Sequence, residues 1–208
     1  YSSYLAKEMQ NINQMLVALN NDPDLATFSM LLNEKFNYET VSTQKNIETK
    51  MGIIFYASDY ITDVYLLLPQ NNRQLSFRMG SSTIGSSKQE ILDRIEQSSL
   101  KLERFSKDDT LSYVIVSSDN SRINYVLGVD INENRILDGL KSLEKDETFN
   151  VFLIENKSQL LIGSRRLTSL DRNIYESLSK QKEIKSSGEI IINKEKYVIM
   201  ADKSEDGV

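Results

Sequence analysis

The sequence predicts an α+β fold in which a long N-terminal helix precedes two tandem modules built on antiparallel sheets. Residues 1–58 show helical periodicity and no strand pattern, whereas 60–131 reads as hairpin, helix and hairpin in that order. The same order of elements recurs in 149–203. Because a fixed order of elements occurs twice, we predict a duplicated module.

The N-terminal region, residues 1–58, is predicted to form three helices. An apolar stripe with spacings of three and four residues lines one face of the helix over 1–20: Leu5, Met9, Ile12, Leu16 and Leu19. We interpret this stripe as a surface that packs on a neighbouring helix of the same domain; its heptad-like spacing is also compatible with a dimer seam. Asp22 as N-cap and Pro23 in the first turn predict a second helix, and a third is expected over 38–58.

The first module is assigned to residues 59–145 and the second to 146–208. The elements predicted for the first are a hairpin (60–68 and 73–78), a flexible Gly/Ser loop (78–88), a helix from 89 to about 100, a second hairpin (111–119 and 122–131) and a helix capped by Asn132. Those predicted for the second are a hairpin over 151–163, a helix over 167–181 and a hairpin over 188–201. The hairpins that open the modules begin alike, VYLL at Val64 and VFLI at Val151.

The composition excludes several classes of site. The 208 residues include no Cys, His or Trp, and the net charge is −5. Without Cys and His the chain lacks thiolates, the most common general base and the most common transition-metal ligand. A Ser-His-Asp triad within the chain is thereby excluded, and we predict no catalytic residue, no metal site and no cofactor. Scattered basic residues on an acidic chain argue against nucleic-acid binding.

No signal peptide or transmembrane segment is predicted, because the longest apolar runs are far shorter than 18 residues. The first residue is Tyr1 rather than Met. We infer that the sequence is a piece of a larger protein.

Asp130 is the first candidate ligand-binding residue, because it ends a strand whose neighbours are apolar. Strand alternation places it on one face with Asn124, Val126 and Gly128. Gly128 leaves room for a ligand or another backbone to approach, so we predict that the Asp130 carboxylate accepts hydrogen bonds from a ligand. The alternative is that Asp130 caps the following helix or closes a turn. A calcium loop over 130–141 is rejected, since its sixth and twelfth residues are not the required Gly and Glu.

Three tyrosines and one arginine are further candidates for ligand binding. Tyr65, Tyr113 and Tyr125 lie on predicted strands of the first module, and each combines an apolar ring with a hydroxyl that suits a sugar or an amine. The alternative is that they are ordinary core or sheet-surface aromatics. Arg78 lies where the Gly/Ser loop begins and would pair with an anionic group; the alternative is a solvated surface arginine.

The predicted organisation resembles the double Cache sensor domain, a PAS-like extracellular region of bacterial sensor kinases and chemoreceptors. The motif YVLGVDI, Tyr125 to Ile131, is similar to the Cache pattern that closes the first module, and VFLIENKSQLLIGS, Val151 to Ser164, resembles the start of the second. The opening YSSYLAKEMQNINQMLVALNNDPDL is similar to the segment that follows the first membrane helix of YesM-like histidine kinases from Gram-positive bacteria. The resemblance covers nearly the whole chain.

This resemblance implies a non-catalytic sensor domain on the extracellular face of the cell membrane, belonging to a two-component histidine kinase. It implies membrane helices before Tyr1 and after Val208, and a homodimer in the full-length protein. The expected partner is a small solute, with carbohydrate favoured, or a solute-binding protein. The amino-acid-binding subfamily carries an Arg-x-Trp-Tyr motif; this sequence has no Trp, and only Asp130 fits that subfamily's pattern. Amino-acid sensing is therefore not expected.

Three rival hypotheses remain. The same sensor domain would also serve a chemoreceptor or a membrane-anchored transcription regulator. A carboxylate-based glycoside hydrolase would need two paired acids in a cleft, and the 30 Asp and Glu residues make chance pairs easy. An adhesion module would bind no small ligand.

Overall fold

The computed structural model describes residues 2–31, 38–95, 102–105, 110–119, 122–142, 152–155, 160–163, 173, 187–192 and 195–200. These residues form an α+β architecture, as predicted. The chain divides into two compact units, one of residues 8–133 and one that joins residues 1–7 to 134–208. The predicted three-part division into 1–58, 59–145 and 146–208 stays a prediction.

Three helices precede the sheet, in the positions that the sequence predicts. They are α1 (Ser2–Asn20), α2 (Pro23–Leu31) and α3 (Tyr38–Ala57). Asp22 caps α2 as expected, because its Oδ1 accepts a hydrogen bond of 3.0 Å from the backbone N–H of Asp24. Lys50 of α3 forms ion pairs with Asp22 and Asp24 at 2.7 and 2.8 Å. These contacts join the start of α2 to the middle of α3.

The predicted apolar stripe of α1 is largely buried within the chain. Ile12, Leu16 and Leu19 are each at most 4% exposed, and Met9 is half-buried. The stripe is buried as expected, whereas a neighbouring helix as its packing partner stays a prediction. These side chains are therefore not available as a seam for a second copy, and the homodimer stays a prediction.

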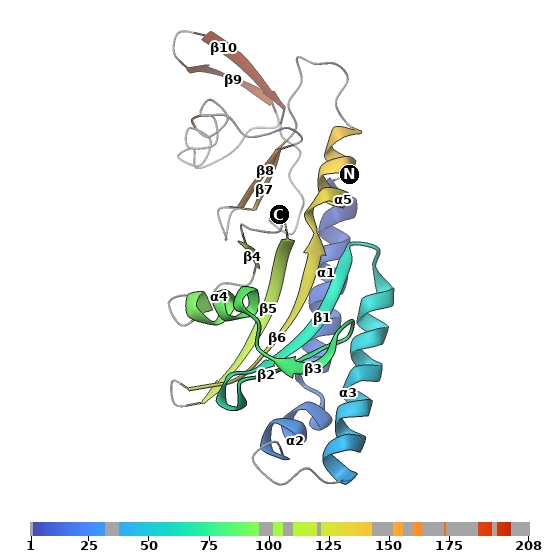
Figure 1. Cartoon of the computed structure of the whole chain (residues 1–208). Helices are drawn as coiled ribbons and strands as arrows, with labels where there is room; N and C mark the ends of the chain where they lie inside the picture. The colour runs from blue at the N-terminus through green and yellow to red at the C-terminus, as the bar shows by residue number, and fades with distance from the viewer. Residues whose placement is uncertain are drawn as a thin grey trace. The chain divides into compact units, whose positions relative to one another are not determined.

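The unit of residues 8–133 contains a six-stranded antiparallel sheet in the order β3-β2-β1-β6-β5-β4 (Figure 1). Its strands are β1 (Ile61–Leu68), β2 (Arg73–Ser76), β3 (Gly80–Thr83), β4 (Leu102–Phe105), β5 (Thr110–Asp119) and β6 (Arg122–Asn132). Both predicted hairpins of the first module are present, as β1–β2 and β5–β6. The two hairpins join along β1 and β6, which pair from Ile61↔Ile131 to Leu67↔Val126.

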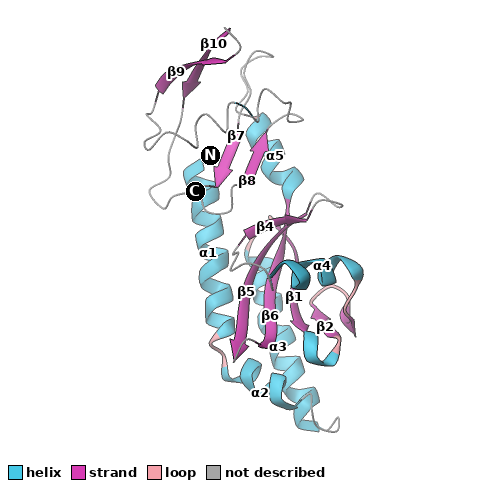
Figure 2. Ribbon diagram, turned by 90° about the vertical axis from the view of Figure 1, so that its left-hand side faces the viewer, coloured by secondary structure: helices cyan, strands magenta, loops and turns pink. Residues whose placement is uncertain are grey.

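Helices cover both faces of this sheet. Figure 2 shows α1 on one side and α4 (Ser86–Ile95) on the other. On the α4 side, Ile91 and Leu92 belong to a buried apolar cluster with strand residues that include Leu67 and Val126. The opposite face meets α1 through the hydroxyl of Tyr113, as described below. The alternation predicted for β6 holds from Tyr125 onward, because Val126 faces α4 while Tyr125 faces α1. A register shift opposite Ser117 and Ser118 interrupts it at Asn124, and Ile123 packs on the α4 side.

Two elements of the first module differ from the prediction. The expected flexible loop over 78–88 contains the strand β3 and the first turn of α4. β3 has the sequence GSST and is largely exposed, so no apolar alternation reveals it; it forms because the edge of β2 offers unpaired backbone groups. The strand β4 was not predicted. It follows the point, near residue 100, where the predicted helix ends.

The unit of residues 1–7 and 134–208 contains two separate hairpins in its described part. They are formed by β7 (Phe152–Glu155) with β8 (Leu160–Gly163), and by β9 (Ser187–Ile192) with β10 (Glu195–Met200). Both match predicted hairpins. Helix α5 (Glu133–Lys141) follows Asn132 as expected. The predicted helix over 167–181 lies outside the described residues except for Asn173, so the second Cache module stays a prediction.

No helix among the described residues combines the length and apolar character that a bilayer crossing needs.

Candidate ligand-binding site

A row of polar side chains crosses the α4-facing side of the sheet. Asp63 of β1 pairs with Asp130 of β6, and Asp130 pairs in turn with Ser112 of β5. Residues directly opposite each other on antiparallel strands project to the same face. The next row of that face begins the apolar cluster under α4, so the polar row marks one end of a buried apolar layer.

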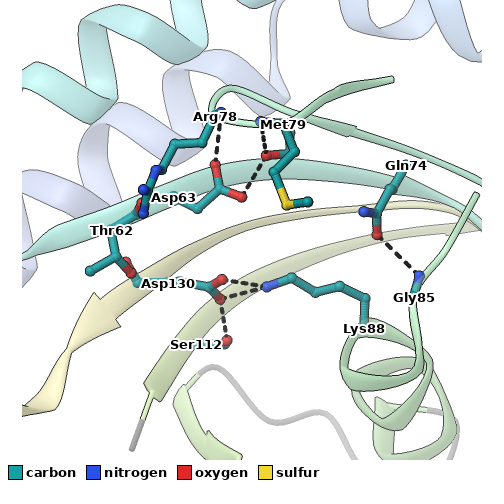
Figure 3. Close-up of polar contacts among 10 residues, drawn as sticks. Thr62, Asp63, Gln74, Arg78, Met79, Gly85, Lys88, Ser112 and Asp130 are labelled. Carbon is teal, nitrogen blue, oxygen red and sulfur yellow. Dashed lines mark hydrogen bonds and ion pairs between the residues drawn. The ribbon is translucent and has the colours of Figure 1, made fainter. Parts of the chain in front are cut away.

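The Asp130 carboxylate is held by one cation and one hydroxyl (Figure 3). The Nζ of Lys88 donates to its two oxygens at 2.6 and 2.5 Å, and the Ser112 hydroxyl donates to Oδ1 at 2.6 Å. The side chains of Lys88 and Asp130 are each only 14% exposed. Lys88 lies in the first turn of α4, and its Nζ is 3.5 Å from the centroid of the Tyr65 ring. We call Tyr65, Lys88, Ser112 and Asp130 the Asp130 cluster.

The Tyr65 side chain fills the space above Gly128. The two residues are paired across β1 and β6, and a Cβ added to Gly128 would lie 2.5 Å from the Tyr65 Cζ. The sequence predicted that Gly128 leaves room for a ligand or a backbone; in this structure a side chain of the same sheet takes that room. Gly is needed there because any larger residue would overlap the ring.

The Tyr65 hydroxyl is buried and makes no hydrogen bond to any residue that the structure describes. Burial is the main reason why the pKa of Tyr65 is raised well above its ordinary value, and the negative charge of Asp130 adds to the shift. The nearby Ser112 hydroxyl offsets part of this shift without reaching good hydrogen-bond geometry. Tyr65 therefore stays a neutral phenol with one donor to spare inside the cluster.

Among the described residues, Asp63 accepts hydrogen bonds from neutral donors alone. Ser76 Oγ donates to its Oδ2 at 2.7 Å, and the backbone N–H of Arg78 donates to its Oδ1 at 3.3 Å. Burial raises the pKa of Asp63, and these two donors oppose the shift; the charge of Asp130 raises it further. Burial also lowers the pKa of Lys88, against the opposing effect of Asp130. One buried cation thus lies among two neighbouring acids.

The structure brings Asp130 and Tyr65 together, as candidate residues of one site. Arg78 lies beside them in the turn between β2 and β3, exposed, with its guanidinium donating to the Thr62 carbonyl at 3.4 Å. The Asp130 carboxylate is bonded to Lys88 and Ser112, which is a different arrangement from the helix cap considered as the alternative.

Tyr113 and Tyr125 lie on the opposite face of the sheet. The Tyr113 hydroxyl donates to Asn13 Oδ1 at 2.6 Å, and the Tyr125 hydroxyl donates to Asn20 Oδ1 at 3.2 Å. Both asparagines lie on α1. These tyrosines do not join the Asp130 cluster. Their surroundings match the alternative interpretation, that of aromatics on a packed face.

Sequence reasoning missed Lys88, Asp63 and Ser112. Asp63 carried a weak signal, because strand alternation places this acid on the same face as Tyr65 in a mostly apolar strand. Lys88 carried no such signal, since a lysine that follows Gly and Ser residues is expected to lie on the surface. Within the described residues, no group of three or more Asp, Glu, His or Cys side chains is placed to hold a metal ion.

Comparisons with known proteins give remote structural similarity alone. No protein-family model matches the chain, and no curated protein does. The sensory domain of the Campylobacter jejuni chemoreceptor Tlp3 (CcmL) aligns at 14% identity with a TM-score of 0.47, over 95% of this chain and 89% of that chain. The same domain with isoleucine bound aligns at 13% identity with a TM-score of 0.42, over 95% of this chain and 88% of that chain. The Tlp3 ligand-binding domain in complex with L-valine aligns at 13% identity with a TM-score of 0.41, over 95% of this chain and 88% of that chain. Similarity this remote assigns neither a function nor a ligand to this chain.

Proposed function

We propose that this chain is a Cache-type sensor domain that binds a small solute at the Asp130 cluster. It lies on the extracellular face of a membrane and belongs to a transmembrane histidine kinase. The kinase assignment follows from the resemblance of the N-terminal segment to YesM-like kinases. The domain itself is non-catalytic and needs no cofactor.

The observation that carries this proposal is a charged and hydroxyl-bearing cluster at one end of a buried apolar layer. A buried ion pair such as Lys88–Asp130 is often no more stabilising than apolar side chains of the same volume. The buried Tyr65 hydroxyl, unbonded within the described part of the chain, adds a further cost. Ligand binding explains why these polar groups are buried, whereas packing alone does not.

The solute class is proposed from the resemblance and from the charges of the cluster. A carbohydrate remains the favoured ligand, because hydroxyl groups both donate to and accept from the kinds of group that the cluster holds. A solute-binding protein that delivers the carbohydrate is the alternative partner. Signalling then requires that the ligand bind one arrangement of the domain more tightly than another.

A glycoside hydrolase is the second candidate, and the Asp63–Asp130 pair is the observation that favours it. Glycosidases use two carboxyl groups whose environments hold their pKa values apart, and burial raises the pKa of Asp63. The ion pair with Lys88 argues the other way, because it occupies both oxygens of the Asp130 carboxylate. Release of nitrophenol from a set of aryl glycosides tests this candidate directly.

The test of the sensor proposal is a thermal-shift screen against sugars, oligosaccharides, amino acids including isoleucine and valine, amines and organic acids. A ligand that binds only the folded state raises the melting temperature. We expect a saturable shift with at least one sugar, and its loss in Asp130→Asn and Ser112→Ala.

Tyr113→Phe is the matched control, because it changes one hydroxyl on the opposite face of the same sheet. It is expected to leave the ligand response intact. A response that Asp130→Asn and Tyr113→Phe reduce equally would contradict a site at the Asp130 cluster. No response across the panel would contradict direct sensing of these solute classes and favour recognition of a solute-binding protein.

A further inference from the structure

The ammonium group of Lys88 occupies a position that is complete as a binding site for a primary ammonium ion. Two of its contacts are the Asp130 oxygens, at 2.6 and 2.5 Å. Its third neighbour is the face of the Tyr65 ring, 3.5 Å from Nζ to centroid. A carboxylate combined with an aromatic face is the chemistry by which proteins recognise ammonium groups.

The helix that carries Lys88 is anchored independently of this ion pair. Ile91 and Leu92 of α4 are buried in the apolar cluster on the sheet, one turn beyond Lys88. Figure 3 shows the extended Lys88 side chain reaching from α4 to Asp130. The ammonium is therefore tethered at a fixed distance from the carboxylate and does not need to be recruited from solution.

We propose that Lys88 is a specificity-determining residue, a tethered ammonium that fills a primary-ammonium subsite formed by Asp130 and Tyr65. The inference rests on the proposed function of the Asp130 cluster as the ligand site. A free amine competes poorly with Lys88, because the tether supplies a high effective concentration of the same chemical group. The wild-type site is thereby closed to amines and left to solutes that engage hydroxyl groups, which agrees with the favoured carbohydrate.

A second observation separates a subsite from an ordinary structural ion pair. The Tyr65 hydroxyl is fully buried beside the pair and forms no hydrogen bond with the described residues. A cluster that existed only to neutralise Asp130 would be more stable with Phe at position 65, since an unpaired buried hydroxyl is destabilising. The Tyr65 hydroxyl is therefore available to donate a hydrogen bond to an oxygen atom of a ligand.

The test removes the tether and supplies the missing atoms in solution. Lys88→Ala lacks the three carbons and the nitrogen beyond Cβ, and n-propylammonium has those same atoms. We expect the melting temperature of Lys88→Ala to fall by about 5 °C or more, because a partly buried carboxylate loses its cation. Millimolar n-propylammonium chloride should restore it in a saturable manner, relative to sodium chloride at equal ionic strength.

Four controls accompany the titration, two with other proteins and two with other compounds. Wild-type protein should show no specific shift with n-propylammonium, because Lys88 already fills the subsite. The double variant Lys88→Ala with Asp130→Asn should show none either, since the carboxylate is gone. Tetramethylammonium, which has no N–H donor, and n-propanol, which has no charge, should not replace n-propylammonium.

A second measurement applies if Lys88→Ala does not fold. Wild-type protein is acetylated with an N-hydroxysuccinimide ester, and each lysine is followed by mass spectrometry. Lys88 should react at least tenfold more slowly than exposed Lys45, and Asp130→Asn should remove most of that protection. A wild-type Lys88 that reacts as fast as Lys45 would overturn the tethered arrangement.

The outcomes distinguish this inference from the proposed function. If n-propylammonium shifts wild-type protein as strongly as Lys88→Ala, or shifts neither, the Lys88 inference is wrong, and a sugar response in the solute screen still stands on its own. If rescue succeeds but no solute in the panel binds, the ammonium subsite stands and the proposed direct sensing of those solutes does not.

Discussion

Asp63 and Asp130 lie directly opposite each other on β1 and β6, yet their carboxylates have different partners. Asp130 is paired with the buried ammonium of Lys88, whereas the groups in the described part of the chain that donate to Asp63 are neutral. Like charges directly opposite each other across two strands destabilise a sheet. The difference between these two acids leads to predictions that separate their roles.

Asp130→Asn is expected to destabilise the domain by roughly 2 kcal/mol, because it leaves the ammonium of Lys88 without its counter-charge. The free energy of unfolding from urea titrations at neutral pH measures this change. Asp63→Asn is the matched substitution one strand away. It should be neutral or slightly stabilising, because it removes an acid that forms no ion pair with the residues that the structure describes. Equal destabilisation by both substitutions would show that the two carboxylates are equivalent.

The raised pKa of Asp63 predicts a component of stability that depends on pH. Between the unfolded value of 3.8 and the higher folded value, the native state binds more protons at Asp63 than the unfolded state does. The stability that Asp63 contributes is therefore fully present below pH 3.8, and it decreases as the pH rises through the folded pKa. Asp63→Asn lacks this loss.

Urea titrations of Asp63→Asn and wild-type protein, between about pH 4 and pH 7, test this sign. The stability of the variant minus that of the wild type should increase with pH and then become constant. A difference that stays flat across this range would contradict the raised pKa. A constant offset is expected from the altered hydrogen bond to Ser76 and does not affect the slope.

Gly128→Ala is expected to destabilise the domain by about 2 kcal/mol, because the added Cβ would lie 2.5 Å from the Tyr65 Cζ. Both residues belong to central strands, so neither backbone moves aside easily. Gly85→Ala is the matched control, since a Cβ there meets no atom within 4 Å. It should cost less than Gly128→Ala, because it creates no overlap and weakens only the N-cap position of α4. Unfolding free energies of the two variants give the comparison.

The effect of Gly128→Ala should depend on the ring of Tyr65. In a double-mutant cycle with Tyr65→Val, the methyl group added at position 128 no longer meets the ring, so the two costs should be less than additive. Tyr65→Phe should not relieve the overlap, because the Cζ and Cε2 atoms remain. Strict additivity with Tyr65→Val would place the strain elsewhere.

Tyr113→Phe is expected to lower the free energy of unfolding by about 1 kcal/mol, through loss of the hydrogen bond to Asn13. The ligand response of the domain should not change, because the hydroxyl faces α1 on the side of the sheet away from Asp130. A changed ligand profile with unchanged stability would return Tyr113 to the site.

Local patterns in the sequence determined the elements that form from neighbouring residues. The helix over 1–20, the cap at Asp22 and the hairpins all rest on short-range periodicity or turn chemistry, and the structure has them in place. The alternation along β6 also placed Asp130 and Gly128 on one face before any partner was known. A strand has a period of two, so its own residues suffice for that assignment.

The tertiary structure alone decided which groups meet on that face. The register between β1 and β6 pairs residues that are 59 to 70 positions apart in the sequence, from Leu67↔Val126 to Ile61↔Ile131, and it sets Asp63 beside Asp130 and Tyr65 over Gly128. Docking of α4 then brings Lys88 to the same carboxylate. Pairings of this kind depend on the packing of the whole unit rather than on local preference, because a shift of one residue in the register would turn Asp63 and Tyr65 of β1 to the other face.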